Sequence, residues 1–160
     1  MDIRTKVREA QRRILDHLAQ CEEAIATLYD AYGRSFPEMA AFWNSLSAEE
    51  HAHVRLLKSL HKQLDKGNVF YNLGRFDTQI IDAYITKARA EQAALKTGTV
   101  SASQAVSVAL LLETSLVDAH FYDIVTSDAP EFTVIADHLS KATRRHIALV
   151  RERLVKQHPN

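Results

Sequence analysis

Turn-forming residues are rare in this chain and fall at a few well-separated places. The four glycines and three prolines make up seven of 160 residues, about a third of the usual share. A fold of many β-strands needs many turns, so this scarcity favours a few long helices. Apolar residues also recur every three or four positions over long stretches, which is the period of an amphipathic helix. The sequence therefore predicts an all-α protein.

Five helices are expected, with boundaries uncertain by two to four residues. Gly33 and Pro37 are expected to break the first helical region, and Ser127 and Pro130 have the positions of a helix cap and a first-turn proline. The third helix lies in a long connection, whereas the turns before the second and fifth helices are short. This spacing predicts two antiparallel hairpins joined lengthwise in one domain over residues 1–160. The expected helices cover residues 3–32, 37–65, 77–95, 101–126 and 129–156.

Charge and cysteine content exclude several classes of function. Lys+Arg and Asp+Glu number 20 each, which argues against a basic nucleic-acid groove or a polybasic membrane patch. No run of 18 apolar residues occurs, and the N-terminal residues lack the apolar core of an export signal, so we expect a cytoplasmic protein without a membrane partner. The single cysteine, Cys21, excludes an intrachain disulfide and a CxxC site. No P-loop, GxGxxG motif or Ser/His/Asp arrangement is present.

Glutamates and histidines interrupt the apolar stripes near the middle of the four long helices. A buried carboxylate costs several kcal/mol unless it is paired or bound to metal, and three at similar depth would repel one another. The arginines nearby fall mostly off these stripes. A divalent cation would resolve the conflict, because carboxylate and imidazole suit iron or manganese, and imidazole also suits zinc. The inward set is Glu22, Glu50, His53, Glu113, His120 and His146.

The spacing of Glu50 and His53 favours a shared metal ion. Residues three apart are neighbours on one face of a helix, about one turn from each other. The ExxH pattern alone is common. Its specificity comes from its place on an apolar stripe, with inward glutamates on two other helices and an inward histidine on the last.

These residues resemble the signature of rubrerythrin-type members of the ferritin-like, di-iron carboxylate superfamily. Glu22 with Tyr29, the segment 42–53, Glu113 and His146 carry the resemblance. It covers residues 15–64 and 104–155. It implies a four-helix bundle with one crossover carrying an extra helix, a homodimer and a dinuclear iron site. Glu22 and His53 would bind in one half of this site, Glu113 and His146 in the other, with Glu50 bridging.

The chain departs from that pattern in the last helix. An ExxH motif would place a second bridging glutamate where this chain has Thr143, so affinity for a second ion should fall. His120, seven residues after Glu113, is either a replacement ligand or a polar core residue. A rubredoxin module needs four cysteines and is absent from this sequence, so electrons would come from an external donor.

Three functions remain open from the sequence. The first is a peroxidase- or ferroxidase-type oxidoreductase that reduces peroxide or reacts with dioxygen. The second is a protein that binds one or two metal ions without turnover, and the third is a metal-free helical scaffold. Tyr29 and Tyr122 are candidate hydrogen-bond donors near the site. Glu23, Glu49, His51 and His138 fall off the stripes and are expected to be solvated.

Overall fold

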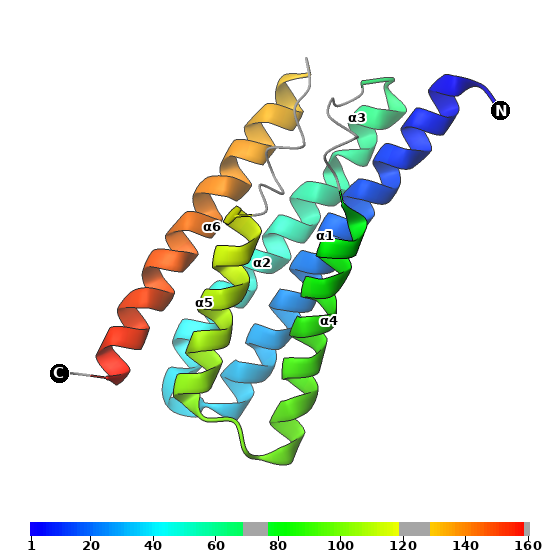
Figure 1. Ribbon diagram of the computed structural model, residues 1–160. Helices are drawn as coiled ribbons and strands as arrows, with labels where there is room; N and C mark the ends of the chain where they lie inside the picture. Colours follow the sequence, from blue (N-terminus) through cyan, green and yellow to red (C-terminus); the bar gives the residue numbers. More distant parts are fainter. Residues whose placement is uncertain (69–76, 119–128, 159–160) are drawn as a thin grey trace.

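The computed structural model describes residues 1–68, 77–118 and 129–158, and every regular element in these ranges is helical (Figure 1). The all-α prediction is confirmed. Three short helices, η1, α3 and η3, connect the long ones. The elements are α1 (Ile3–Ser35), η1 (Pro37–Met39), α2 (Ala40–Ser59), α3 (His61–Asp65), α4 (Thr78–Ala94), η3 (Leu95–Thr97), α5 (Ala102–Asp118) and α6 (Pro130–Gln157).

The long helices lie side by side along one common direction (Figure 1). Helices α1 and α2 form an antiparallel hairpin, and α5 and α6 run antiparallel to each other as a second pair. Helix α4 packs along α1 and carries the chain from the α3 end of the molecule to the opposite end, where α5 begins. This is the lengthwise connection that the long third segment predicts.

The first turn begins later than the sequence suggests. Gly33 was expected to break the first helix, but α1 continues through it to Ser35. Gly33 instead permits close packing of α1 against α2, because a Cβ at this position would lie 2.6 Å from Oδ1 of Asn44. The break comes at Pro37, which starts η1 and has no backbone N–H to continue α1.

The other expected helices are shorter or divided. The segment 37–65 contains η1, α2 and α3, with Leu60 separating the last two. Gly67 and Gly98, in the predicted breaks, have φ angles of 87° and 71°, which favour glycine. Pro130 is the first residue of α6, as expected. The predicted continuation of α5 to residue 126, and the predicted cap at Ser127, lie outside the described residues.

The core follows the apolar stripes. Large side chains of α1 and α2 are fully buried, and Trp43 packs its ring against those of Tyr29 and Tyr32 at centroid distances of 5.4 and 4.8 Å. Burial of each such side chain contributes about 1.5–3 kcal/mol. This core surrounds the polar cluster described below. Within the described ranges, no helix is both long and apolar enough to cross a membrane.

Candidate metal centre

Five of the six inward residues predicted from the sequence converge in the interior of the bundle. Glu22 comes from α1, Glu50 and His53 from α2, Glu113 from α5 and His146 from α6. Each is at most 1% exposed. Their ligand-type atoms form two trios, each spanning no more than 4.8 Å, which could hold a metal ion. We call Glu22, Glu50 and His53 the first trio, and Glu50, Glu113 and His146 the second trio.

The first trio is built from the α1–α2 hairpin. Nδ1 of His53 donates a hydrogen bond of 2.9 Å to Oε2 of Glu50, its neighbour one helical turn away. The same nitrogen lies 3.9 Å from Oε1 of Glu22. One imidazole nitrogen therefore faces two carboxylates.

The second trio joins three helices. Nδ1 of His146 lies 2.7 Å from Oε1 of Glu50 and 3.4 Å from Oε1 of Glu113. Glu50 therefore belongs to both trios, with Oε2 toward His53 and Oε1 toward His146. The two imidazole rings stack with centroids 5.7 Å apart and an interplanar angle of 20°.

Several polar atoms of the second trio are crowded together without well-aligned hydrogen bonds. Oε1 of Glu50 and Nδ1 of His146 approach to 2.7 Å, yet these two atoms and Oε2 of Glu113 are buried and form no hydrogen bond of good geometry in the described part of the chain. Buried polar atoms are almost always hydrogen-bonded, and such an atom left without a partner costs about 1–3 kcal/mol. A cation between these atoms would satisfy all three, so the donor set fits a metal ion.

The carboxylates have different proton affinities despite similar burial. Burial raises the pKa of Glu22 well above its ordinary value, and the charge of Glu50 raises it further. Burial and the charge of Glu50 also raise the pKa of Glu113 to about 7, although His146 and Tyr29 oppose this shift. Burial raises the pKa of Glu50 too, but hydrogen bonding and attraction to His146 and His53 outweigh it and lower the pKa below its ordinary value.

The carboxylates around His146 favour its protonated form when no metal is bound. Burial alone lowers its pKa, but the carboxylates of Glu113 and Glu50 outweigh this effect and raise the pKa to about 11. The raised pKa values of Glu22, Glu113 and His146 mean that the metal-free cluster favours bound protons, which offset part of its negative charge. A metal ion would displace these protons, because metal ligands bind in their deprotonated form.

Two further residues hold the second trio in place. The hydroxyl of Tyr29 donates a hydrogen bond of 2.8 Å to Oε1 of Glu113. On its other side, Nε2 of His146 lies 3.0 Å from Oε2 of Glu49, which also forms an ion pair with Arg145. Tyr29 was a candidate donor from the sequence. Glu49 was expected to be solvated; about a third of its side chain is exposed (35%), and the rest contacts α6, which approaches the side of α2 on which Glu49 lies.

The remaining predicted positions contribute less. Thr143 is buried, and its hydroxyl donates to the backbone carbonyl of Leu139 at 2.9 Å, so it adds no carboxylate to the cluster. His120 and Tyr122 lie outside the described residues. Cys21 is buried near the three glutamates, and burial together with their charges raises the pKa of its thiol.

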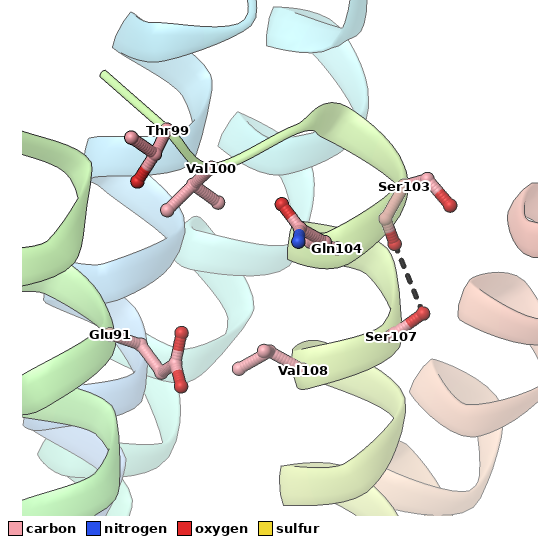
Figure 2. Close-up of a pocket in the computed structure, with 7 residues that line it drawn as sticks. All are labelled: Glu91, Thr99, Val100, Ser103, Gln104, Ser107 and Val108. Carbon is pink, nitrogen blue, oxygen red and sulfur yellow. Dashed lines mark hydrogen bonds between the residues drawn. The ribbon is translucent and has the colours of Figure 1, made fainter. Parts of the chain in front are cut away.

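A groove elsewhere on the molecule is separate from this cluster. It has a volume of about 390 Å³ and lies between α4 and α5, where Glu91 faces Gln104 and Val108 (Figure 2). None of the five converging residues lines it. Glu91 is paired with Lys87 at 2.5 Å. The groove is therefore a feature distinct from the two trios.

The search for related proteins gives no family. No family model, curated protein or solved structure matches this chain. The functional argument therefore depends on the side chains of the cluster themselves.

Proposed function

We propose that the cluster is a dinuclear metal centre, of the kind found in rubrerythrin-type proteins of the ferritin-like superfamily, and that iron is its metal. Glu22 and His53 would bind one ion, Glu113 and His146 the other, and Glu50 would bridge the two. On this proposal the chain is an oxidoreductase that reduces peroxide or reacts with dioxygen. The order of helices, with two antiparallel pairs and a lengthwise crossover, supports the ferritin-like reading.

The position of Glu50 carries the proposal. Its two carboxylate oxygens face different trios, Oε2 at 2.9 Å from His53 and Oε1 at 2.7 Å from His146. A carboxylate held in this way would offer one oxygen to an ion in each trio. A structural role alone does not explain why the cluster keeps three carboxylates and two imidazoles buried together, since apolar residues of similar volume are often as stable.

The side chains prepare the site for oxygen chemistry. When bound, two ferrous ions would supply the two electrons needed to cleave an O–O bond. Burial of every ligand excludes bulk water, so charges and hydrogen bonds in the site act with little screening. The hydroxyl of Tyr29 holds Oε1 of Glu113 and leaves Oε2 of that carboxylate for an ion. An external electron donor would supply the reducing equivalents. We further propose a homodimer, on the family resemblance alone.

A second candidate is a protein that holds a single ion without turnover. Thr143 favours it, because its hydroxyl is turned to the backbone of α6 and adds no charge to the cluster. Three glutamates carry three negative charges against the four positive charges of two divalent ions. This charge deficit lowers the affinity for the second ion more than the affinity for the first. Manganese or zinc would serve this function as well as iron.

Metal analysis after anaerobic purification tests the proposal. We expect two irons per chain, oxidised rapidly when peroxide is added. Ion binding should also raise the melting temperature, since 100-fold excess over Kd stabilises by about 2.7 kcal/mol, roughly 5–10 °C for a chain of this size. The Glu50→Gln variant should lose both effects, whereas Glu23→Gln, which changes an exposed neighbour of Glu22, should keep them.

The other outcomes discriminate between the candidates. One redox-silent ion per chain would support the second candidate. No bound metal, with a melting temperature unchanged by Fe²⁺, Mn²⁺ or Zn²⁺, would contradict both metal functions and leave a helical scaffold.

A further inference from the structure

Glu49 lies outside both trios but touches one of their members. Its Oε2 is 3.0 Å from Nε2 of His146, and it is also paired with Arg145, the neighbour of that histidine on α6. The side chain of His146 is fully buried, whereas 35% of the side chain of Glu49 is exposed. Glu49 therefore links the buried cluster to the surface where α2 and α6 meet.

This contact gives the Nε2 proton of His146 an acceptor when an ion takes the place of the proton on Nδ1. A neutral imidazole has one protonated nitrogen and one with a free lone pair, and only the second is a ligand. A carboxylate at Nε2 keeps the proton there and leaves the lone pair on Nδ1. Nδ1 is the nitrogen that faces Glu50 and Glu113.

We propose that Glu49 is a positioning residue, which holds the ring of His146 and its Nε2 proton so that Nδ1 is presented to the second trio. This inference rests on the proposed function, because it concerns how one ligand of the metal centre is oriented. Arg145 also holds this carboxylate, so two neighbouring residues of α6 contact Glu49 of α2.

Zinc binding provides the first test, since Zn²⁺ is redox-silent and accepts imidazole and carboxylate ligands. The variants Glu49→Ala, Glu49→Gln and Glu23→Ala are titrated with Zn²⁺ against a chelating dye. Loss of an outer partner of a metal ligand lowers affinity by about 10–100-fold, and we expect this for one of the two ions in Glu49→Ala. Glu49→Gln should recover most of the affinity, because its amide oxygen accepts the same hydrogen bond.

Glu23→Ala is the matched control. It removes an exposed carboxylate next to the ligand Glu22, as Glu49→Ala removes one next to the ligand Glu50, and it should bind Zn²⁺ as the unaltered protein does. Equal affinities of Glu49→Ala and Glu23→Ala would overturn the proposal. It would also be overturned if Glu49→Gln bound as weakly as Glu49→Ala, because the hydrogen bond would then have no role.

A second readout does not depend on metal. In ¹H–¹⁵N NMR spectra of the metal-free protein, the Nε2–H of His146 should exchange slowly with water, and this protection should disappear in Glu49→Ala. Protection that survives in Glu49→Ala would contradict the proposal. If the unaltered protein binds none of Fe²⁺, Mn²⁺ and Zn²⁺, the proposed function fails, and this NMR measurement still decides whether Glu49 positions the ring.

Discussion

The two trios use the same ligand types but are assembled differently. The first is contained in one hairpin, where Glu50 and His53 are neighbours on α2 and Glu22 lies on α1. The second requires α2, α5 and α6 to come together, and its members span residues 50–146. The second also has outside support, from Tyr29 on Glu113 and from Glu49 on His146. Ligands that are distant in sequence are thus the ones held by additional contacts.

This difference suggests separate roles for the two halves. The first trio forms as soon as α1 and α2 pair, so it depends little on the rest of the fold. The second trio depends on the docking of the α5–α6 pair and lacks a carboxylate at Thr143. We therefore expect the first trio to bind its ion more tightly. Substitutions should change the affinity of the second trio more than that of the first.

Removal of the shared ligand should have the largest effect. Glu50→Gln deletes a charge from both trios, so both ions should be lost, as measured by metal analysis. The sequence alone suggests that removal of a buried acid stabilises the metal-free protein. The structure reverses this expectation, because Glu50 pairs with both His53 and His146. A loss of about 1–3 kcal/mol in unfolding free energy is expected, with helicity retained by circular dichroism.

Retention of one tightly bound ion in Glu50→Gln would contradict the claim that both trios depend on Glu50. It would show that one trio binds without the shared carboxylate, and that the two sites are independent. Glu23→Gln should match the unaltered protein in both measurements.

Addition of a carboxylate at Thr143 should strengthen the second trio. Thr143→Glu places a fourth acid on the face of α6 that carries His146, one helical turn away. We expect affinity for the second ion to rise by about tenfold or more, since an added negative charge near a buried cation acts with little screening. In the metal-free protein the larger side chain should lower stability by roughly 1–3 kcal/mol.

Thr143→Gln separates charge from size. It should cause a similar loss of stability without the gain in affinity, both measured by denaturant titration and Zn²⁺ titration. A gain in affinity as large in Thr143→Gln as in Thr143→Glu would contradict the charge-deficit argument.

The unfolding free energy of the metal-free protein should fall as pH rises, because of the protons held by the second trio. The pKa of Glu113 is raised from an ordinary 4.5 to about 7, so between these values the unfolded chain has lost a proton that the folded chain keeps. The unfolding free energy therefore falls with rising pH, by up to about 1.4 kcal/mol per unit. His146, with its pKa raised to about 11, extends this fall above pH 6.5.

Denaturant unfolding at several pH values checks this behaviour. Between pH 5 and 7, Glu113→Gln should lose stability less steeply than the unaltered protein. Equal slopes would show that Glu113 is ionised throughout this range. Saturating Zn²⁺ should flatten the slope in the unaltered protein, because metal binding favours the deprotonated ligands.

The smallest expected effect concerns the hydroxyl of Tyr29. Tyr29→Phe removes the hydrogen bond to Glu113. The affinity of the second trio for its ion should fall by about tenfold, and the affinity of the first trio should not change. Tyr32→Phe is the matched control, since Tyr32 is also fully buried but its hydroxyl has no hydrogen-bond partner among the described residues. Equal Zn²⁺ titration curves for the two variants would show that the hydroxyl of Tyr29 does not orient the ligand.

The sequence predicts the parts of this site that follow helical periodicity. Glu22, Glu50, His53, Glu113 and His146 lie on apolar stripes, and each faces the interior as expected. The all-helical fold follows from the same stripes and from the scarcity of turn-forming residues. His120, the sixth candidate, lies outside the described residues and stays a prediction.

Contacts that depend on the approach of two helices cannot be predicted in this way. Glu49 precedes Glu50 and lies about 100° from it around α2, so periodicity assigns it to solvent. Its contact with His146 depends on how closely α6 crosses α2. Gly33 was interpreted as a helix breaker for a similar reason, because only the packing against Asn44 shows why a side chain is excluded there.

An anomalous-scattering map of crystals grown with Fe²⁺ or Mn²⁺ tests the central claim most directly. The account predicts two peaks in the bundle interior, one within bonding distance of Glu22 and His53, the other near Glu113 and His146, with Glu50 touching both. A map without a peak among these five side chains, from crystals soaked in excess metal, would contradict it.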